Sequence, residues 1–76
     1  MNNKEEITAF MENVAFLRRQ NKLTKKKMCE ILGIGILSLN KIEKGQLPKR
    51  ITVEVIFKIK KYFGINASEL FKKQNI

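Results

Sequence analysis

The side chains best suited to chemistry in this sequence are basic, and their spacing favours the binding of anions. Three consecutive lysines, Lys25, Lys26 and Lys27, follow Thr24, a residue type that commonly caps the start of a helix. Cations in the first turn oppose the helix dipole, at a cost of roughly 0.3–1 kcal/mol each before solvent screening. That cost is explained if an anion such as a phosphate docks on the free N–H groups of the helix start. A tolerated run of surface lysines is the alternative interpretation.

The net charge of +9 is concentrated in the middle of the chain. Residues 13–50 carry ten basic and two acidic residues, whereas residues 1–12 carry one basic and three acidic residues. This balance favours a polyanionic partner, either nucleic acid or an anionic membrane surface, because the summed charge attracts such a partner. A basic surface that only keeps the protein in solution is the simpler alternative.

Catalytic and metal-binding patterns find little support in the sequence. The chain contains no histidine, so Cys–His catalysis and histidine-based metal sites are excluded. The seven acidic residues are scattered, and no glycine-rich phosphate loop is present. The single Cys29 closes no internal disulfide and is predicted to pack as a small hydrophobic residue. We therefore expect a protein that is not an enzyme and uses no metal, cofactor or small-molecule substrate.

Length and hydropathy define the size and the setting of the protein. The 76 residues are expected to form one domain, residues 1–76, and the longest apolar run is far too short to span a membrane. The N-terminal stretch has acidic residues and no long apolar segment, so it does not resemble a signal peptide. A lone cysteine is typical of a reducing compartment. These features predict a cytoplasmic protein.

Glycines and the single proline divide the chain into five segments, and each segment has the pattern of a helix. No segment alternates apolar and polar residues at every second position, so no strand is expected. The predicted fold is all-α, with helices at about residues 5–20, 25–32, 36–44, 52–63 and 67–72.

The side of each helix that faces the core is predicted from the same spacing. In the first three helices it contains Ile7, Phe10, Met11, Val14, Leu17, Met28, Ile31, Leu32, Leu39 and Ile42. In the fourth helix a broad apolar face, with basic interruptions, contains Val53, Ile56, Phe57, Ile59, Lys60 and Phe63. The short last helix is expected to dock through Leu70 and Phe71, with Asn66 and Glu69 forming a capping box at its start.

Two short helices separated by a tight turn around Gly33 have the spacing of a helix-turn-helix, in which the second helix enters the major groove. Five short signals follow in order: Leu-Thr at 23–24, Leu-Gly-Ile at 32–34, Ile-Glu-x-Gly at 42–45, Phe-Gly-Ile at 63–65 and Glu-Leu-Phe at 69–71. In this order and at these separations, the chain resembles the Xre/Cro-like helix-turn-helix family of phage and bacterial regulators. The resemblance covers residues 13–71 and implies a five-helix repressor-like bundle that binds operator DNA, usually as a dimer.

The resemblance also implies roles for individual residues. The residues assigned to DNA phosphates, including two from the lysine run, are Thr24, Lys25, Lys26, Lys44, Lys49 and Arg50. The residues assigned to base edges are Ile36, Leu37, Ser38, Asn40 and Lys41. Arg18 and Glu43 match a structural ion pair that bridges the first helix to the end of the third and orients the recognition helix.

The start of the third predicted helix departs from the family pattern. Gly35 stands where Ser or Thr is usual, so this cap has no side-chain oxygen. Ile36 and Leu37 stand where polar or basic residues are usual, and they cannot make the bidentate hydrogen bonds that distinguish bases. They would pack on thymine methyls, contact a protein partner or a second subunit, or be partly buried after a small register shift. Asn40 is then the only amide available for an adenine.

Together these patterns predict a transcription regulator, expected to be a repressor, in the bacterial cytoplasm and on the nucleoid when bound. We expect a homodimer on a pseudo-palindrome of double-stranded DNA, with half-sites about one helical turn apart. The first alternative is a protein-interaction module with the same fold that uses Ile36 and Leu37. The second is a membrane-surface protein, which the fourth predicted helix fits only in part because the core needs its apolar face.

Overall fold

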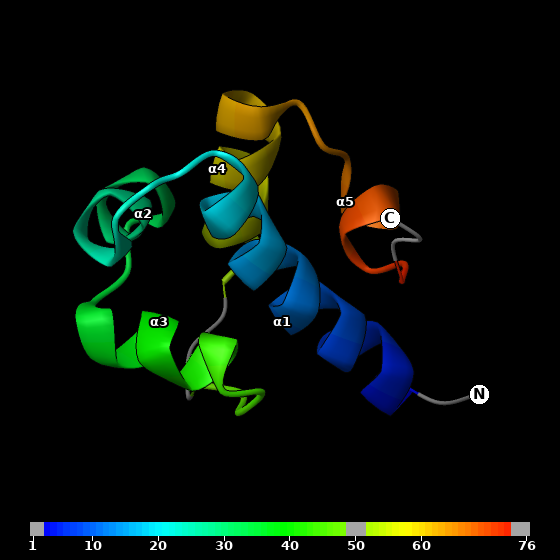
Figure 1. Ribbon diagram of the computed structural model, residues 1–76. Coiled ribbons are helices and arrows are strands. Elements are labelled where there is room, and N and C mark those ends of the chain that lie inside the picture. Colours follow the sequence, from blue (N-terminus) through cyan, green and yellow to red (C-terminus); the bar gives the residue numbers. More distant parts are fainter. Residues whose placement is uncertain (1–2, 49–51, 74–76) are drawn as a thin grey trace.

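Five α-helices and no strand form the parts of the chain that the computed structural model describes, residues 3–48 and 52–73. The helices are α1 (Asn3–Gln20), α2 (Lys25–Leu32), α3 (Ile36–Glu43), α4 (Val53–Phe63) and α5 (Ala67–Leu70). Figure 1 shows α1 as a long diagonal helix, with α2 and α3 on one side of it and α5 on the other. The predicted all-α fold is therefore confirmed.

The helix bounds differ slightly from the predicted ones, and the caps explain two of the differences. α1 begins two residues earlier than expected, and α5 ends two residues earlier. Thr52 and Lys44, which were predicted to be helical, are instead the residues that cap α4 and α3. α2 has the predicted bounds.

Local signals in the sequence account for the ends of α2 and the start of α5. The Thr24 hydroxyl accepts a hydrogen bond from the Lys27 backbone N–H at 3.0 Å, which satisfies one free donor of the first turn. Gly33 ends α2 in the left-handed region at φ 71°, a backbone conformation that residues other than glycine rarely adopt. At α5, the Glu69 carboxylate accepts from the Asn66 backbone N–H at 3.1 Å as part of the predicted capping box.

The core contains side chains from all five helices. Its fully buried members are Phe10, Val14, Met28, Leu32, Leu39, Ile42, Ile59 and Leu70. Burial of each such side chain contributes roughly 1.5–3 kcal/mol relative to exposure, which makes this cluster the main source of stability. The buried sides predicted for the first three helices agree with these positions, while Ile7 and Ile31 are partly buried against the same cluster.

The buried side predicted for α4 is partly wrong. Val55 and Ile59 face the core, whereas Val53 is 81% exposed and Phe57 is 63% exposed. Lys60 is also exposed. Apolar residues occur all around the first two turns of α4, so spacing alone does not determine which side is buried. Packing against α2 and α5 determines it in the structure.

A buried amide, which the sequence analysis did not identify, joins the end of the described chain to α1. The Asn13 side-chain N–H₂ donates to the Leu70 carbonyl at 2.6 Å and to the Lys72 carbonyl at 2.9 Å. Carbonyls at the end of a helix lack partners within the helix, so the amide satisfies them. The stacked rings of Phe10 and Phe71, with centroids 5.3 Å apart, lie in the same contact between α1 and the end of α5.

Candidate nucleic-acid interface

The turn between α2 and α3 consists of residues 33–35 and is fixed by backbone hydrogen bonds. The N–H groups of Gly33 and Ile34 both donate to the Cys29 carbonyl, at 2.8 and 3.1 Å. Leu39 and Ile42 then anchor the inner side of α3 in the core. The two helices are thereby held in a defined orientation, and the opposite side of α3 remains exposed.

The outer side of α3 carries both charged and apolar residues. At roughly 100° per residue, Leu37, Lys41 and Lys44 lie opposite the buried Leu39. All three are exposed, and Asn40 lies half-buried at the edge of this side. Ser38 is half-buried at the other edge. Of the residues assigned to bases, Leu37 and Lys41 therefore lie on one outward side, with Ser38 and Asn40 at its two edges.

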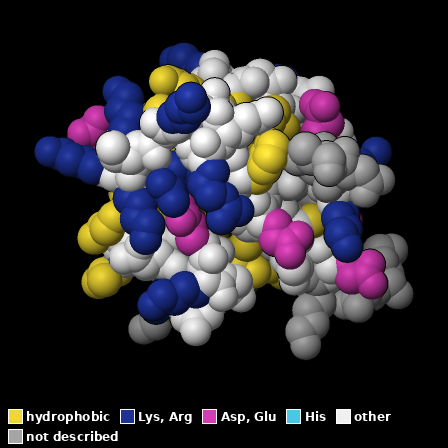
Figure 2. Space-filling model, in the orientation of Figure 1, with side chains coloured by type: hydrophobic (Ala, Val, Ile, Leu, Met, Phe, Trp, Pro, Cys, Tyr) yellow, Lys and Arg dark blue, Asp and Glu magenta, His cyan; other side chains and the backbone are white. Residues whose placement is uncertain are grey.

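Ile36 and Leu37 both lie at the surface. Ile36 is 46% exposed and Leu37 is 75% exposed, so the option in which a register shift buries one of them is wrong. Gly35 caps α3 without any side-chain hydrogen bond, as its lack of a side chain requires. Figure 2 shows hydrophobic side chains at the edge of the molecule beside the basic ones, on the side where Figure 1 places α3.

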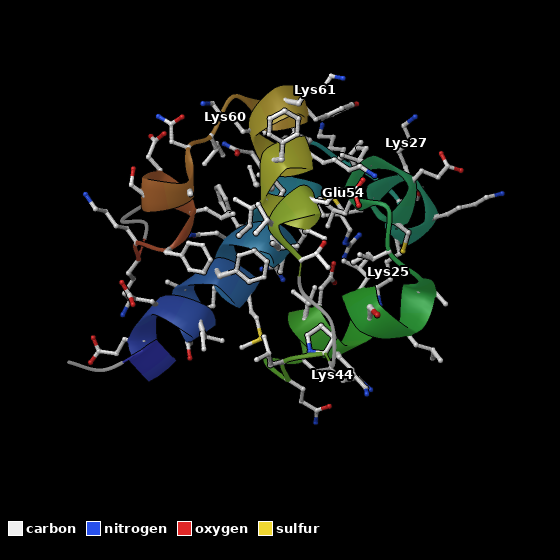
Figure 3. The ribbon with its side chains drawn as sticks, turned by 180° about the vertical axis from the view of Figure 1, so that it is seen from behind. Lys25, Lys27, Lys44, Glu54, Lys60 and Lys61 are labelled. Atoms are coloured by element: carbon white, nitrogen blue, oxygen red, sulfur yellow. The ribbon has the colours of Figure 1, made fainter. Side chains whose placement is uncertain are left out.

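A direct contact joins the start of α2 to the outer side of α3. The Lys25 ammonium donates to the Asn40 side-chain carbonyl at 2.9 Å, and this contact is exposed. A residue assigned to a phosphate and a residue assigned to a base are therefore neighbours. In Figure 3, Lys25 and Lys44 both lie on the α3 side of the molecule. No pattern in the sequence predicts this bond, since it depends on the distance between two helices.

We define the basic surface as the exposed lysines of α2 and of α3 with its cap: Lys25, Lys26, Lys27, Lys41 and Lys44. Figure 2 shows Lys and Arg side chains gathered over this half of the molecule, with most of the visible acidic side chains over the other half. Lys27 lies 4.0 Å from Glu30, and an exposed pair of this kind is weak. Lys49 and Arg50, which were also assigned to phosphates, lie outside the described residues.

An ion pair behind the basic surface joins three parts of the fold. The Arg18 guanidinium donates to both carboxylate oxygens of Glu43, at 2.6 and 3.1 Å, and to the Leu23 carbonyl at 3.1 Å. The two side chains are only 19% and 13% exposed. The hydrogen bonds with Glu43 raise the pKa of Arg18 above its ordinary value, while burial acts in the opposite direction. The end of α1 thus holds the loop before α2 and the last turn of α3 in place.

The C-terminal end of α2 is stabilised by a lysine from α4. A Cβ atom placed on Gly33 would lie 2.5 Å from the Lys58 ammonium, so this cation lies directly against the end of α2. A positive charge at that end is favourable because the helix dipole is negative there. Lys58 also lies 3.6 Å from Glu54, one turn earlier in α4. Lys58 therefore contributes to the packing between α2 and α4, a role that the sequence analysis did not identify.

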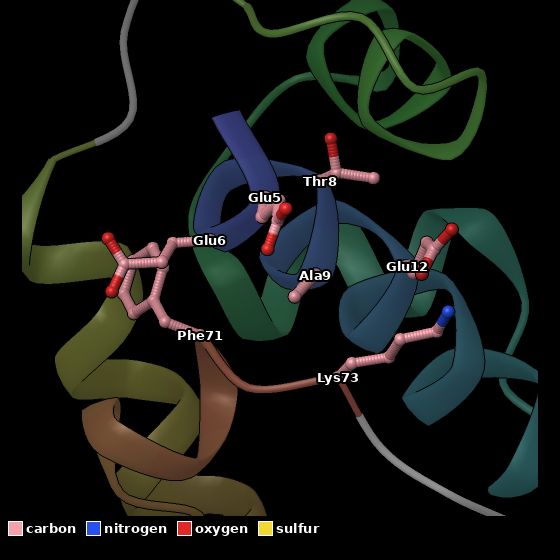
Figure 4. Close-up of a pocket in the computed structure, with 7 residues that line it drawn as sticks. All are labelled: Glu5, Glu6, Thr8, Ala9, Glu12, Phe71 and Lys73. Atoms are coloured by element: carbon pink, nitrogen blue, oxygen red, sulfur yellow. The ribbon is translucent and has the colours of Figure 1, made fainter. Parts of the chain in front are cut away.

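An open cavity of about 610 Å³ lies on another part of the surface, between α1 and the end of the described chain (Figure 4). Its lining consists of Glu5, Glu6, Thr8, Ala9, Glu12, Phe71 and Lys73. Three carboxylates with one lysine disfavour an anionic ligand at this place. Within residues 3–48 and 52–73, no group of three or more acidic, cysteine or histidine side chains is arranged to hold a metal ion. None of the helices described there has the length and apolarity to cross a bilayer.

Comparison with known protein families agrees with this geometry. Residues 11–76 match the family model described as a helix-turn-helix domain, and the match includes α2, the turn and α3. Comparisons with curated proteins and with solved structures gave no match. The family match covers most of the sequence and agrees with the observed order of helices, so the chain belongs to the helix-turn-helix domain family.

Proposed function

We propose that this protein is a sequence-specific regulator of transcription, a repressor of the Xre/Cro-like type, that places α3 in the major groove of double-stranded DNA. The observation that carries the proposal is the contact between Lys25 and Asn40, which unites the lysines at the start of α2 with the outer side of α3. A helix-turn-helix binds a duplex with these two elements, one on the backbone and one in the groove.

The start of α2 is suited to a phosphate. Thr24 caps the N–H of Lys27, so the N–H groups of Lys25 and Lys26 are the ones without a partner inside the helix. A phosphate bound there would accept from these N–H groups and meet the lysine side chains above them. Lys44, Lys49 and Arg50 would reach the flanking DNA backbone.

Base recognition is assigned to the outer side of α3. Asn40 offers the donor and acceptor pair that matches adenine, and Ser38 and Lys41 offer single hydrogen bonds. Ile36 and Leu37 would pack on thymine methyl groups. The ion pair of Arg18 and Glu43 would set the angle at which α3 enters the groove. In this proposal the protein acts in the bacterial cytoplasm, as a homodimer on two half-sites about one helical turn apart.

The direct test is selection of bound sequences from a random pool of duplexes, followed by a salt titration on the selected site. With about five phosphate contacts per protomer, the logarithm of the association constant, expressed per bound protomer, should fall against the logarithm of salt concentration with a slope of about −4.5. Replacing Lys25 and Lys44 by alanine should reduce this slope by about two. The control removes two charges at the far side, Lys72→Ala with Lys73→Ala, and should leave the slope nearly unchanged. Absence of salt-dependent binding at low ionic strength would contradict the proposal.

A second candidate function, a protein-interaction module, is favoured by the exposure of Ile36 and Leu37. The double variant Ile36→Ala, Leu37→Ala separates the two functions on the selected duplex. If these side chains contact thymines, its affinity should fall about tenfold and its preference for thymine at those positions should weaken. Unchanged affinity and unchanged preference would show that the two residues do not touch DNA, and would favour the second candidate.

A further inference from the structure

The exposed side of α4 contains large apolar residues that do not pack in the core. Val53 and Phe57 lie one turn apart and are 81% and 63% exposed. Val55 and Ile59 occupy the opposite side of the helix and make its contribution to the core. An aromatic ring exposed to this extent gains from burial against another surface, since apolar surface in water is unfavourable.

Charged residues flank this apolar pair on the same side of the helix. At roughly 100° per residue, Glu54, Lys60 and Lys61 all lie within about 60° of the direction of Phe57. All three are exposed. We define the α4 face as Val53, Glu54, Phe57, Lys60 and Lys61. Figure 3 shows Glu54 towards one end of α4 and Lys60 and Lys61 at the other, so the face is negative at its start and positive at its end.

The order of charges along the α4 face is complementary to the same order read in the opposite direction, as in an antiparallel copy of the helix. Glu54 lies three residues before Phe57 and Lys61 four residues after it, on the same edge of the face. When two copies of α4 meet antiparallel with their Phe57 rings at the centre, Glu54 of each copy lies opposite Lys61 of the other. A parallel arrangement would instead place like charges together, which is unfavourable.

The contacts that Glu54 makes within its own chain leave it available for such a pair. Its carboxylate is 3.6 Å from the Lys58 ammonium, and its side chain is 72% exposed. Ion pairs that are exposed to this extent contribute little and rearrange at little cost. Lys58 itself remains against Gly33, so the change affects only the carboxylate.

We propose that the α4 face is the surface through which two copies of this chain associate, antiparallel and related by a two-fold axis that passes beside Phe57. This inference deepens the homodimer that forms part of the proposed function. The occupant is a second copy because the face complements itself in both apolar surface and charge, as an isologous interface requires. A lipid surface fits less well, since charges border the apolar pair on both edges.

The first test measures self-association by sedimentation equilibrium, with the full chain and without DNA. Phe57→Ala should weaken dimerisation by about a hundredfold, because each dimer buries two of these rings. At concentrations low enough that both chains are monomeric, its thermal unfolding should match that of the original chain, since the ring is mostly exposed in one copy. The matched control is Leu37→Ala, an exposed residue of α3, which should leave the dimer unchanged. A dimer that is lost with Leu37→Ala and kept with Phe57→Ala would overturn the proposal.

The second test exchanges the two charges. Glu54→Lys or Lys61→Glu alone places like charges opposite each other twice in the dimer, and each should weaken association by about tenfold. The double variant restores opposite charges with the net charge of +9 unchanged, and should recover most of the affinity. Lys27→Glu on α2 controls for the altered net charge of the Lys61→Glu variant. Absence of recovery in the double variant, or a monomer at all concentrations, would overturn the proposal.

Neither experiment uses DNA, so their outcomes are separable from those of the proposed function. A chain that binds its selected duplex steeply with salt but stays monomeric would retain the regulator assignment and exclude the α4 interface. A chain that dimerises through α4 but binds no duplex would retain the α4 interface and exclude the regulator assignment.

Discussion

Arg18 shows how a single side chain fixes the position of a whole helix. Its guanidinium contacts Glu43 with two hydrogen bonds and Leu23 with a third, and the two charged groups are mostly shielded from water. A planar fork of this kind cannot be replaced by an ammonium group, which offers its donors in a different geometry. The last turn of α3 therefore depends on the identity of this residue as well as on its charge.

We predict that Arg18→Ala lowers the free energy of unfolding by about 2 kcal/mol, because Glu43 is left mostly buried without its partner. Arg18→Lys should recover only part of this loss. Urea denaturation measures both variants. Arg19→Ala, the exposed neighbour, is the control and should cost less than about 0.5 kcal/mol. Equal losses for the variants of Arg18 and Arg19 would mean that the fork is not important for stability.

The lone thiol should be slow to react in the folded protein. Burial raises the pKa of Cys29 above its ordinary value, and the carboxylates of Glu43 and Glu30 add to the effect. Because the thiolate is the reactive form, the native chain at pH 7 should react with a disulfide reagent more slowly than the unfolded chain. The rate should rise as the pH approaches the raised pKa. A fast reaction at pH 7 in the folded state would argue against this environment.

At the scale of elements, most of the helices could be predicted because their signals are local. Thr24 and Gly33 fix the two ends of α2 through bonds and dihedral angles within a few residues. The centre of the buried side of α1 could be predicted because large apolar residues recur there at helical spacing, at Phe10, Val14 and Leu17. In α4, the spacing of apolar residues predicts a core role for Val53 and Phe57 because apolar residues occur on both sides of its first two turns. The charged residues Glu54, Lys60 and Lys61 mark the exposed side, and packing against α2 and α5 buries the other.

In the candidate site too, some features follow from local signals in the sequence and others depend on packing between helices. The exposure of the outer side of α3 followed from the burial of Leu39 and Ile42, one turn apart. The bond between Lys25 and Asn40 could not be predicted, because it joins residues that only the packing of α2 on α3 brings together. The position of Lys58 against Gly33 depends on packing in the same way.

Substitution of Gly33, the residue that ends α2, should lower the stability because of its backbone conformation and its contact with α4. We predict that Gly33→Ala costs about 1–2 kcal/mol of unfolding free energy, because alanine is strained at φ 71° and its methyl group displaces the Lys58 ammonium. Gly35→Ala is the matched control, since φ there is −82° and no atom lies within 4 Å of the added group. It should change stability by less than about 0.5 kcal/mol, as measured by thermal and urea denaturation. A similar loss at both glycines would contradict this explanation.

For the molecule as a whole, the attachment of α5 is important because a chain of 76 residues has a small core. We predict that Asn13→Ala leaves the carbonyls of Leu70 and Lys72 unsatisfied and costs about 1–3 kcal/mol. For a domain of this size, each 1 kcal/mol lowers the melting temperature by about 4–8 °C. Circular dichroism against temperature measures the change. Asn21→Ala is the control and should have a smaller effect, because the Asn21 amide donates to the nearby Leu17 carbonyl at the end of α1 and joins no distant parts of the chain.

In the proposed regulator, Lys25 competes with the DNA base for the side-chain carbonyl of Asn40, because the two residues are already hydrogen-bonded in the free protein. If Asn40 recognises a base, its carbonyl must first leave the lysine, which is then released towards the nearest phosphate. An adenine satisfies the Asn40 amide with two hydrogen bonds, whereas a base that makes one hydrogen bond or none leaves part of the amide unsatisfied. Discrimination at that position would therefore arise as much from what a wrong base fails to replace as from what the right base offers.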